Sequence, residues 1–288
     1  MIGSKLFNKA ILAFITLFFL LIIFCLIDSK ENLKTIEPSR DTGTIESIHF
    51  PLNTTSKRNM VKIAILDVKP SDKGEEYIDQ INFMKKNTYE INKKTHSDDI
   101  ASIIRKYSPV SSKVDLFVVS DKMQAISNEL VIQALEQIIA KDYDIINMSF
   151  YLKESNQKIN FLIKELYRKN VVCVASVGNQ GLRKNNYPSN LQEVISVGAI
   201  DETGEKWTES NYGSTDFVMP YKMESFIDGT EIEGTSVSSA LMTAYIAHFK
   251  NAKEYNSNED LYRLLISNTN NNIYNSSTGY GQPSLKKQ

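Results

Sequence analysis

Apolar residues recur along this chain in two alternating patterns. Short runs rich in β-branched residues, which are typical of buried strands, lie at 60–68, 113–120, 143–150, 171–179 and 194–200. Segments with apolar residues three or four positions apart predict helices at 98–109, 127–141, 156–170, 236–252 and 257–269. Strands that alternate with helices are typical of a mostly parallel sheet covered by helices on both faces. The pattern therefore predicts one α/β domain over residues 60–288.

The N-terminal part of the chain has a different pattern. Residues 10–27 carry no charged side chain and, as a helix, would span about 27 Å, close to the ~30 Å hydrocarbon core of a membrane. No small-residue cleavage site follows, so we predict an uncleaved transmembrane signal anchor, with a cleaved signal peptide as the alternative. Lys5 and Lys9 favour a cytoplasmic N-terminus at 1–9 and a catalytic domain outside the membrane. The polar segment 28–59 is predicted to be a linker.

Composition and charge exclude some classes of function. Hydrophobic residues make up 42% of the chain and charged residues 23%, which is ordinary for a globular protein. The 33 basic and 34 acidic side chains give a net charge of −1, so we expect no nucleic-acid partner. Cys25 and Cys173 lie in separate apolar runs, which argues against a disulfide framework, and no Cys/His spacing typical of zinc is present.

Four polar side chains are candidates for chemistry because of their positions in the predicted elements. Asp67 ends the first strand and Asn179 follows the fourth, at the strand ends where open parallel sheets place their functional residues. His96 begins the first helix, and Ser236 begins the long apolar helix. An aspartate, a histidine and a serine can act as orienting group, base and nucleophile. A helix-start amide and an asparagine side chain can stabilise an oxyanion.

Each of these residues also has an ordinary structural interpretation. Asp67 could merely terminate a strand or cap a turn, His96 could be an exposed helix-start residue, and Ser236 could be an N-cap. Asn179 follows Gly178, and this pair is common in turns. The order and the local sequence of all four are more specific than any one of them.

Seven segments carry a resemblance to a known family. They read IAILDVK, HSDDIAS, INMSF, VVCVASVGNQG, YPSNLQEVISVGAID, GTSVSSA and GYGQPSL. Together they resemble the subtilisin-like serine peptidases, and the order Asp…His…Ser is that of the subtilisin branch. The resemblance implies a three-layer subtilisin-like fold with Asp67 as the orienting group, His96 as the base, Ser236 as the nucleophile and Asn179 as an oxyanion donor. It implies no organic cofactor; structural calcium is possible, but no ligands can be assigned and no other metal site is predicted.

The chain departs from the family pattern beside two of these residues. Val68-Lys69 follows Asp67 where the family has Ser/Thr-Gly, and Ser97-Asp98-Asp99 follows His96 where the family has Gly-Thr-His. The two aspartates would raise the pKa of His96 if they lay close to it. These departures keep open a pseudopeptidase, which would use the same fold to bind peptides or to regulate. A non-peptidase α/β membrane protein would require the motif order to be a coincidence.

The resemblance also suggests a substrate class and a substrate cleft. We predict a membrane-anchored endopeptidase that acts outside the cell membrane on a peptide or protein substrate. Its tether and small size favour one specific peptide, such as a bacteriocin leader or a pheromone. Candidates for the cleft walls lie at the ends of the third and fourth strands, and they favour an apolar or aromatic lining: Ser149, Phe150, Tyr151, Ala175, Ser176, Val177 and Gly178.

Overall fold

The computed structural model describes residues 44, 48, 50, 59–84, 91–120, 125–270 and 272–284. The chain divides into two units, Met1–Arg40 and Asp41–Gln288, and all described residues belong to the second. The predicted N-terminus, the predicted anchor at 10–27 and most of the predicted linker lie outside the described residues. Among the described helices, none combines the length and the apolar character that a membrane crossing requires.

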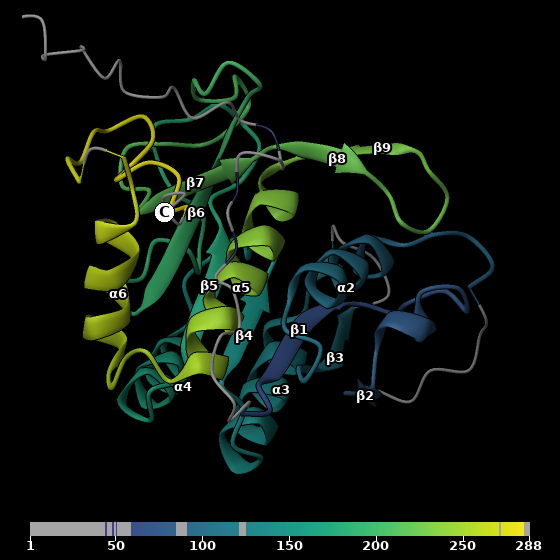
Figure 1. The fold of residues 1–288 in the computed structure, drawn as a ribbon. Helices are drawn as coiled ribbons and strands as arrows, with labels where there is room; N and C mark the ends of the chain where they lie inside the picture. The colour runs from purple at the N-terminus through teal and green to yellow at the C-terminus, as the bar shows by residue number, and fades with distance from the viewer. Residues whose placement is uncertain are drawn as a thin grey trace, which may run out of the picture. The chain divides into compact units, whose positions relative to one another are not determined.

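The domain is built on a seven-stranded parallel sheet. Its strands in chain order are β1 (Lys62–Val68), β2 (Gln80–Phe83), β3 (Lys113–Ser120), β4 (Ile145–Met148), β5 (Val172–Ser176), β6 (Val194–Ile200) and β7 (Phe217–Pro220). Across the sheet their order is β2-β3-β1-β4-β5-β6-β7, so the chain extends the sheet first on one side of β1 and then on the other (Figure 1). An antiparallel pair, β8 (Lys222–Glu224) and β9 (Glu231–Glu233), follows β7.

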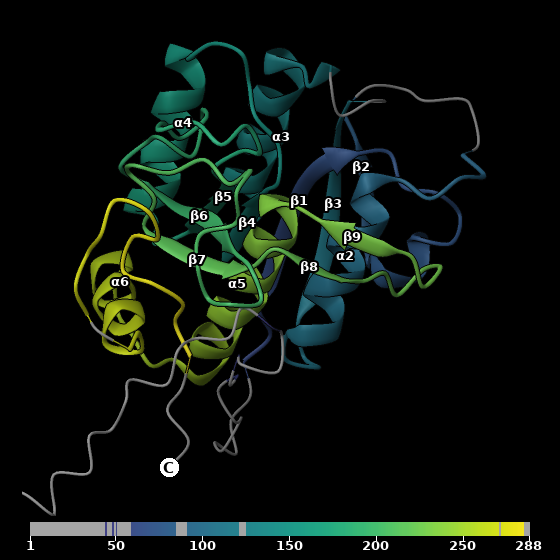
Figure 2. The same ribbon diagram turned by 90° about the horizontal axis from the view of Figure 1, so that it is seen from above.

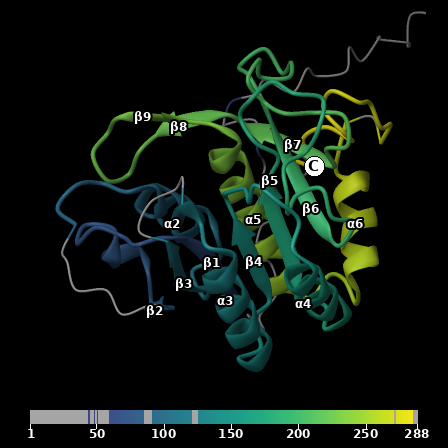
Figure 3. The same ribbon diagram turned by 180° about the vertical axis from the view of Figure 1, so that it is seen from behind.

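Helices cover both faces of the sheet. One face carries α2 (His96–Tyr107), α5 (Thr235–Ala252) and α6 (Asn258–Ser267), as the view along the layers in Figure 2 shows. The other face carries α3 (Asn128–Ala140) and α4 (Gln157–Arg168), which lie in front of the sheet in Figure 3. A short 3-10 helix, η2 (Glu75–Tyr77), precedes β2. The predicted three-layer α/β fold is therefore confirmed.

Strand β1 shows how one apolar run supports two cores. Successive side chains of a strand point to opposite faces of the sheet. Ile63 and Ile65 pack in the cluster that includes α2 and α5, whereas Ala64 and Leu66 pack in the cluster that includes α3 and α4. All four side chains are fully buried. Because both faces are covered, the strand is continuously apolar until it reaches Asp67.

Side-chain caps begin most of the helices, and the start of α5 differs. Ser127 accepts a hydrogen bond from the Leu130 N–H at the start of α3, and Ser257 accepts one from the Asp260 N–H at the start of α6. Helix α5 begins after Gly234, which has no side chain that could accept a hydrogen bond. The Thr235 N–H donates instead to the side chain of Asn179 and the Val237 N–H to the Gly234 carbonyl, whereas the Ser236 N–H takes part in none of the hydrogen bonds among the described residues.

All five predicted strands and all five predicted helices are present, with small shifts at their ends. Helix α2 begins two residues before the predicted start at 98, because Thr95 and Asp98 form a capping box. The sequence did not predict β2, β7, β8 or β9. These strands are only three or four residues long, too short to show a clear alternation of apolar and polar positions.

Part of the predicted linker belongs to the core. Ile48 is 5% exposed and lies in the cluster formed with α2 and α5. The ring of Phe50 stacks on Tyr107 of α2, with centroids 5.3 Å apart, and lies 6.0 Å from the ring of Tyr245 of α5. The packed domain therefore includes residues ahead of the predicted boundary at 60.

Candidate active site

The end of β1 and the start of α2 place a carboxylate against an imidazole. Asp67 is fully buried, and its carboxylate oxygens lie 2.8 and 3.0 Å from Nδ1 of His96. The Val68 N–H donates to the same carboxylate at 2.7 Å and helps to fix its position. Because an ionised carboxylate only accepts hydrogen bonds, Nδ1 of His96 carries a proton. In the neutral ring, Nε2 is then the basic nitrogen.

The environment of His96 favours its protonated form. Burial alone lowers the pKa of His96, but the negative charge of Asp67, the hydrogen bond to Asp67 and the charge of Asp99 together outweigh burial. The pKa of His96 is therefore raised above its usual value. The His96 side chain remains 26% exposed, so a bound molecule can approach the ring.

Ser236 is the accessible serine at the start of α5. It is partly exposed, whereas Ser238 and Ser239 on the same helix are fully buried. The Ser236 hydroxyl donates to the backbone carbonyl of Ser149 at 3.2 Å. Within the described residues, no hydrogen bond joins it to His96.

A buried polar network lies behind Ser236. Ser149 Oγ lies 2.7 Å from Ser239 Oγ and donates to Oδ1 of Asn147 at 2.8 Å. The Asn147 amide donates to Thr243 Oγ1 at 3.0 Å, and Ser239 Oγ donates to the Ser236 carbonyl at 3.1 Å. The network ties the end of β4 to the first turns of α5 and so fixes the backbone that carries Ser236. Ser149 was among the residues predicted for the cleft, whereas the sequence did not predict the roles of Asn147, Ser239 and Thr243.

Asn179 and the start of α5 are held together by Thr235. Oδ1 of Asn179 accepts hydrogen bonds from the Thr235 N–H at 3.0 Å and the Thr235 hydroxyl at 2.7 Å. The Gly178 N–H donates to Thr235 Oγ1 at 3.2 Å. Nδ2 of Asn179 takes part in none of the hydrogen bonds among the described residues, so it can donate to a bound group. The first-turn N–H of Ser236 lies on the same helix end, which favours negative charge.

Gly234 permits this close approach. Its φ of 128° is a conformation that L side chains rarely adopt, and a Cβ there would lie 2.9 Å from Nδ2 of Asn179. We expect Gly234→Ala to lower the free energy of unfolding by about 1–3 kcal/mol and to displace the Asn179 amide. Urea denaturation measures the first effect.

Gly281→Ala is the matched control for Gly234→Ala. Gly281 also has a positive φ, 94°, but a Cβ there would have no atom within 4 Å. Both variants should lose stability through backbone strain, and only Gly234→Ala should also lose any activity that depends on Asn179. Equal losses of activity in the two variants would contradict a specific role for the Gly234–Asn179 contact.

Most of the predicted cleft residues do not present their side chains to a cleft. Phe150 is 3% exposed and packs in the core with α3 and α4, and Ala175 and Val177 are fully buried. These three side chains are therefore buried in this structure, and a role for these positions in substrate binding stays a prediction. Of the remaining four, Ser176, Gly178 and Ser149 are buried, and Tyr151 is 51% exposed.

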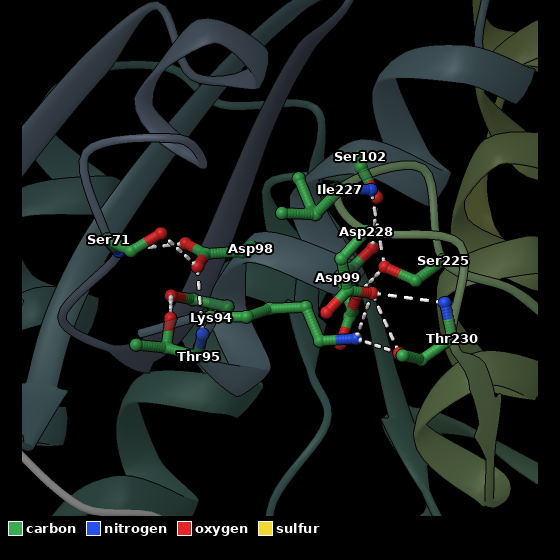
Figure 4. Close-up of polar contacts among 11 residues, drawn as sticks. Ser71, Lys94, Thr95, Asp98, Asp99, Ser102, Ser225, Ile227, Asp228 and Thr230 are labelled. Carbon is green, nitrogen blue, oxygen red and sulfur yellow. Dashed lines mark hydrogen bonds and ion pairs between the residues drawn. The ribbon is translucent and has the colours of Figure 1, made fainter. Parts of the chain in front are cut away.

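Asp98, one of the two aspartates that follow His96, is bonded to residues on either side of the site. Its carboxylate is fully buried and accepts hydrogen bonds from the N–H and hydroxyl of Ser71 and from the Thr95 N–H (Figure 4). It therefore fastens the loop that follows Asp67 to the start of α2. The Thr-x-x-Asp spacing of a capping box could have predicted the contact with Thr95.

A comparison with family models matches residues 39–281 of this chain to Peptidase_S8, the subtilase family. The chain belongs to the subtilase family. The membership in the subtilisin-like serine peptidases that the motifs predicted is thus confirmed.

Relatives of this subtilase with known names align with only part of it. The thermostable alkaline protease of Halalkalibacterium halodurans is 28% identical over 106 residues, which cover 36% of this chain and 29% of that protein. Subtilisin DY of Bacillus licheniformis is 26% identical over 118 residues, which cover 38% of this chain and 43% of that protein. The aligned regions thus span less than half of each relative.

Solved structures align with most of the subtilase. A lanthipeptide protease has a TM-score of 0.63 and 15% identity, and the alignment covers 77% of this chain and 85% of that one. The prenylagaramide maturation protease PagA has a TM-score of 0.60 and 19% identity, with 78% and 91% covered. The self-cleaved protease domain of PatA has a TM-score of 0.63 and 18% identity, with 79% and 95% covered. Because these sequence identities are low, the alignments show a shared fold and nothing more specific.

In the described part of the subtilase, no three His, Cys, Asp or Glu side chains group together as metal ligands would. Structural calcium, which the resemblance suggested, stays a prediction.

Proposed function

We propose that this subtilase is a serine endopeptidase with Ser236 as nucleophile, His96 as general base and Asp67 as the group that orients the base. The observation that carries the proposal is the pair of short contacts, 2.8 and 3.0 Å, between the buried Asp67 carboxylate and Nδ1 of His96. This pair fixes the tautomer in which Nε2 can accept a proton. Membership of the subtilase family and the accessible Ser236 at a helix start support the same assignment.

The reaction begins when Ser236 exchanges its hydrogen bond to the Ser149 carbonyl for one to Nε2 of His96. Catalytic hydrogen bonds often form only once substrate is bound. Ser236 Oγ then bonds to the carbonyl carbon of the scissile peptide while His96 takes the hydroxyl proton. His96 donates that proton to the departing amine, and the peptide C–N bond breaks. Water repeats the sequence on the acyl-enzyme and releases the acid, and the buried Asp67 stabilises the imidazolium throughout.

The oxyanion formed in both steps would bind two donors at the start of α5. These are the Ser236 N–H and Nδ2 of Asn179, whose Oδ1 is already held by Thr235. Such donors act best when they are fixed before the charge develops. The two hydrogen bonds from Thr235 fix the Asn179 amide in this way.

Asn179→Ala is expected to lower kcat about 10²–10³-fold with little change in KM, because the donor acts chiefly in the transition state. Steady-state hydrolysis of a peptide substrate measures both constants. Thr235→Val is the matched control, since it leaves the Asn179 amide present but removes one of its two hydrogen bonds from Thr235. Its loss of kcat should be smaller than that of Asn179→Ala, and an Asn179→Ala enzyme with unchanged kcat would remove Asn179 from the mechanism.

A pseudopeptidase is the second candidate. Two observations favour it: Ser236 bonds to Ser149 instead of His96, and Ser97-Asp98-Asp99 replaces the family's small residues after the base. In this alternative the same fold would bind a peptide, or regulate a partner, without cleaving it.

We further propose that the substrate is one specific peptide precursor and not bulk protein. The structures that share this fold at TM-scores of 0.60–0.63 include proteins named as a lanthipeptide protease and as a prenylagaramide maturation protease. The partly exposed site and the predicted tether agree with this substrate class. Tyr151, 51% exposed and two residues after Ser149, is the candidate for contact with substrate side chains.

The location is part of the proposal and rests on sequence alone. The uncharged run at 10–27 would anchor the chain in the cell membrane as a single span, with residues 1–9 in the cytoplasm. The catalytic domain would then meet its substrate outside the membrane.

Cleavage profiling tests the proposed function. The full chain in detergent micelles is incubated with a defined peptide library, and products are identified by mass spectrometry. Cleavage at a restricted set of sequences supports a specific endopeptidase. Cleavage of casein without preference for particular sequences contradicts the proposal of one specific substrate. Binding of peptides without cleavage supports the pseudopeptidase.

A further inference from the structure

The loop between β8 and β9 is fastened to the first turn of α2, as Figure 4 shows. The Ser225 hydroxyl donates to Asp99, which also lies 3.5 Å from Nζ of Lys94. Lys94 Nζ donates in turn to Asp228 at 2.8 Å and to the Thr230 hydroxyl at 2.7 Å. We refer to these five residues as the hairpin clamp.

Aromatic contacts extend the attachment along α2. The ring of Phe226 lies 6.1 Å from the ring of Tyr107, and Nζ of Lys106 lies 5.7 Å from the Phe226 centroid. The same hairpin continues directly into Gly234 and α5. One element therefore connects the helix that begins with His96 to the helix that carries Ser236.

Asp99 is the carboxylate of the clamp nearest the base in sequence. It lies three residues after His96, so both side chains lie on neighbouring positions of the first helical turn. Its side chain is 12% exposed. The pKa of Asp99 is raised above its usual value, chiefly by burial, and the hydrogen bond from Ser225 and the charge of Lys94 oppose that rise. Ser225 and Lys94 thus stabilise the ionised form of Asp99 against the effect of burial.

We propose that Asp99 is a positioning residue for His96: the hairpin clamp holds its carboxylate one turn from the base, where its charge stabilises the imidazolium formed during the reaction. The proposal rests on the proposed role of His96 as general base. Asp99 touches no reacting atom, and it acts through the charge it places beside His96 and through the hairpin it ties to α2.

Two carboxylates from different elements raise the pKa of His96: Asp67 at the end of β1 and Asp99 on α2. Lys94, which precedes α2, lies 3.5 Å from Asp99 and pairs with Asp228 in the β8–β9 loop. On α2 itself, the carboxylate of Asp98 is bonded to Ser71 and Thr95.

Asp99→Asn tests the proposal, because asparagine keeps the shape and can still accept the Ser225 hydrogen bond. The rate of reaction with a fluorophosphonate probe should fall as His96 becomes protonated at low pH. In Asp99→Asn this fall should move to lower pH, since a negative charge beside the base is lost. At high pH the rate should drop roughly two- to fivefold, the effect of one partly screened charge.

Two further variants distinguish the effect of the Asp99 charge from a general effect of substitution on the structure. Asp260→Asn makes the same change at a carboxylate of α6 that pairs with Arg263 and takes no part in the hairpin clamp, and its pH profile should match that of the unmodified chain. Ser225→Ala keeps Asp99 but removes a hydrogen bond that favours its ionised form, so its profile should move in the same direction as that of Asp99→Asn and by less. If Asp99→Asn and Asp260→Asn shifted equally, or if Asp99→Asn shifted nothing, the proposal would be overturned.

An NMR titration of His96 tests the role of Asp99 without relying on catalysis. The chain has three histidines, so NMR of the full chain with labelled histidine, with His96→Gln to assign the signal, reports the imidazole directly. A lower His96 pKa in Asp99→Asn supports the proposal even if one variant reacts poorly with the probe. No reaction of the folded unmodified chain would overturn the proposed function, whereas an unchanged His96 titration would overturn the role of Asp99 alone.

Discussion

Ser236→Ala is expected to lower kcat for peptide hydrolysis by about 10⁶-fold, the scale of losing the nucleophile of a serine peptidase. The variant removes one oxygen, whose hydrogen bond within the described residues goes to the carbonyl of Ser149. Ser236 is partly exposed and its backbone is fixed by the network behind it, so the fold should remain. Steady-state hydrolysis gives the rate, and thermal unfolding checks the fold.

Ser238→Ala is the control for that substitution, because it makes the same chemical change two residues along the same helix. The Ser238 hydroxyl is buried and donates to the carbonyls of Met219 and Pro220. Its loss should cost about 0.5–1.5 kcal/mol of stability and little activity. If Ser238→Ala were inactive while Ser236→Ala still cleaved peptides, the assigned nucleophile would be wrong.

Asp67→Asn is expected to lower kcat by about 10⁴-fold while KM changes little. The carboxylate accepts from Nδ1 of His96 at 2.8 and 3.0 Å and from the Val68 N–H. The Val68 N–H must bond to the amide oxygen of an asparagine, which turns the NH₂ group toward His96. That NH₂ group would donate to Nδ1 and place the ring proton on Nε2. The base would then have no lone pair to receive the Ser236 proton.

The control for Asp67→Asn is Asp115→Asn, which buries an amide elsewhere in the same sheet. Asp115 is 1% exposed and accepts from the Tyr143 hydroxyl at 2.6 Å, with no contact to His96. We expect Asp115→Asn to lose stability and to keep kcat within about tenfold. Comparable losses of kcat in the two variants would mean that the effect of Asp67→Asn is structural.

The sequence predicted the parts of the site that depend on strand and helix ends. Asp67 ends a continuous apolar strand, and Ser236 begins an apolar helix, so their positions followed from periodicity and from the location of sites in parallel sheets. The pairing of Asp67 with His96 also followed from the motif order. The positions of these residues depend on local sequence, or on the parallel α/β architecture that the hydrophobic pattern predicts.

The features that the sequence missed depend on contacts between distant segments. The clamp joins Lys94 and Asp99 to residues more than a hundred positions later, in a hairpin whose strands are three residues long. The sequence leaves open whether Asp98 and Asp99 approach His96; in the structure Asp98 bonds to Ser71 and Thr95, and Asp99 bonds to Ser225. Phe150 illustrates the same dependence on packing: an aromatic side chain at a strand end can point into the core or into a cleft, and this one packs in the core.

The reaction of the full chain with a fluorophosphonate probe is the most direct test of the account's central claim. Attack by Ser236 Oγ forms an O–P bond and releases fluoride, while His96 takes the hydroxyl proton. Proteolysis and mass spectrometry of the labelled chain locate the adduct, and heat-unfolded protein serves as the control. The account predicts one adduct, on Ser236, in the folded chain only. A folded chain without an adduct, or with the adduct on another serine, would contradict it.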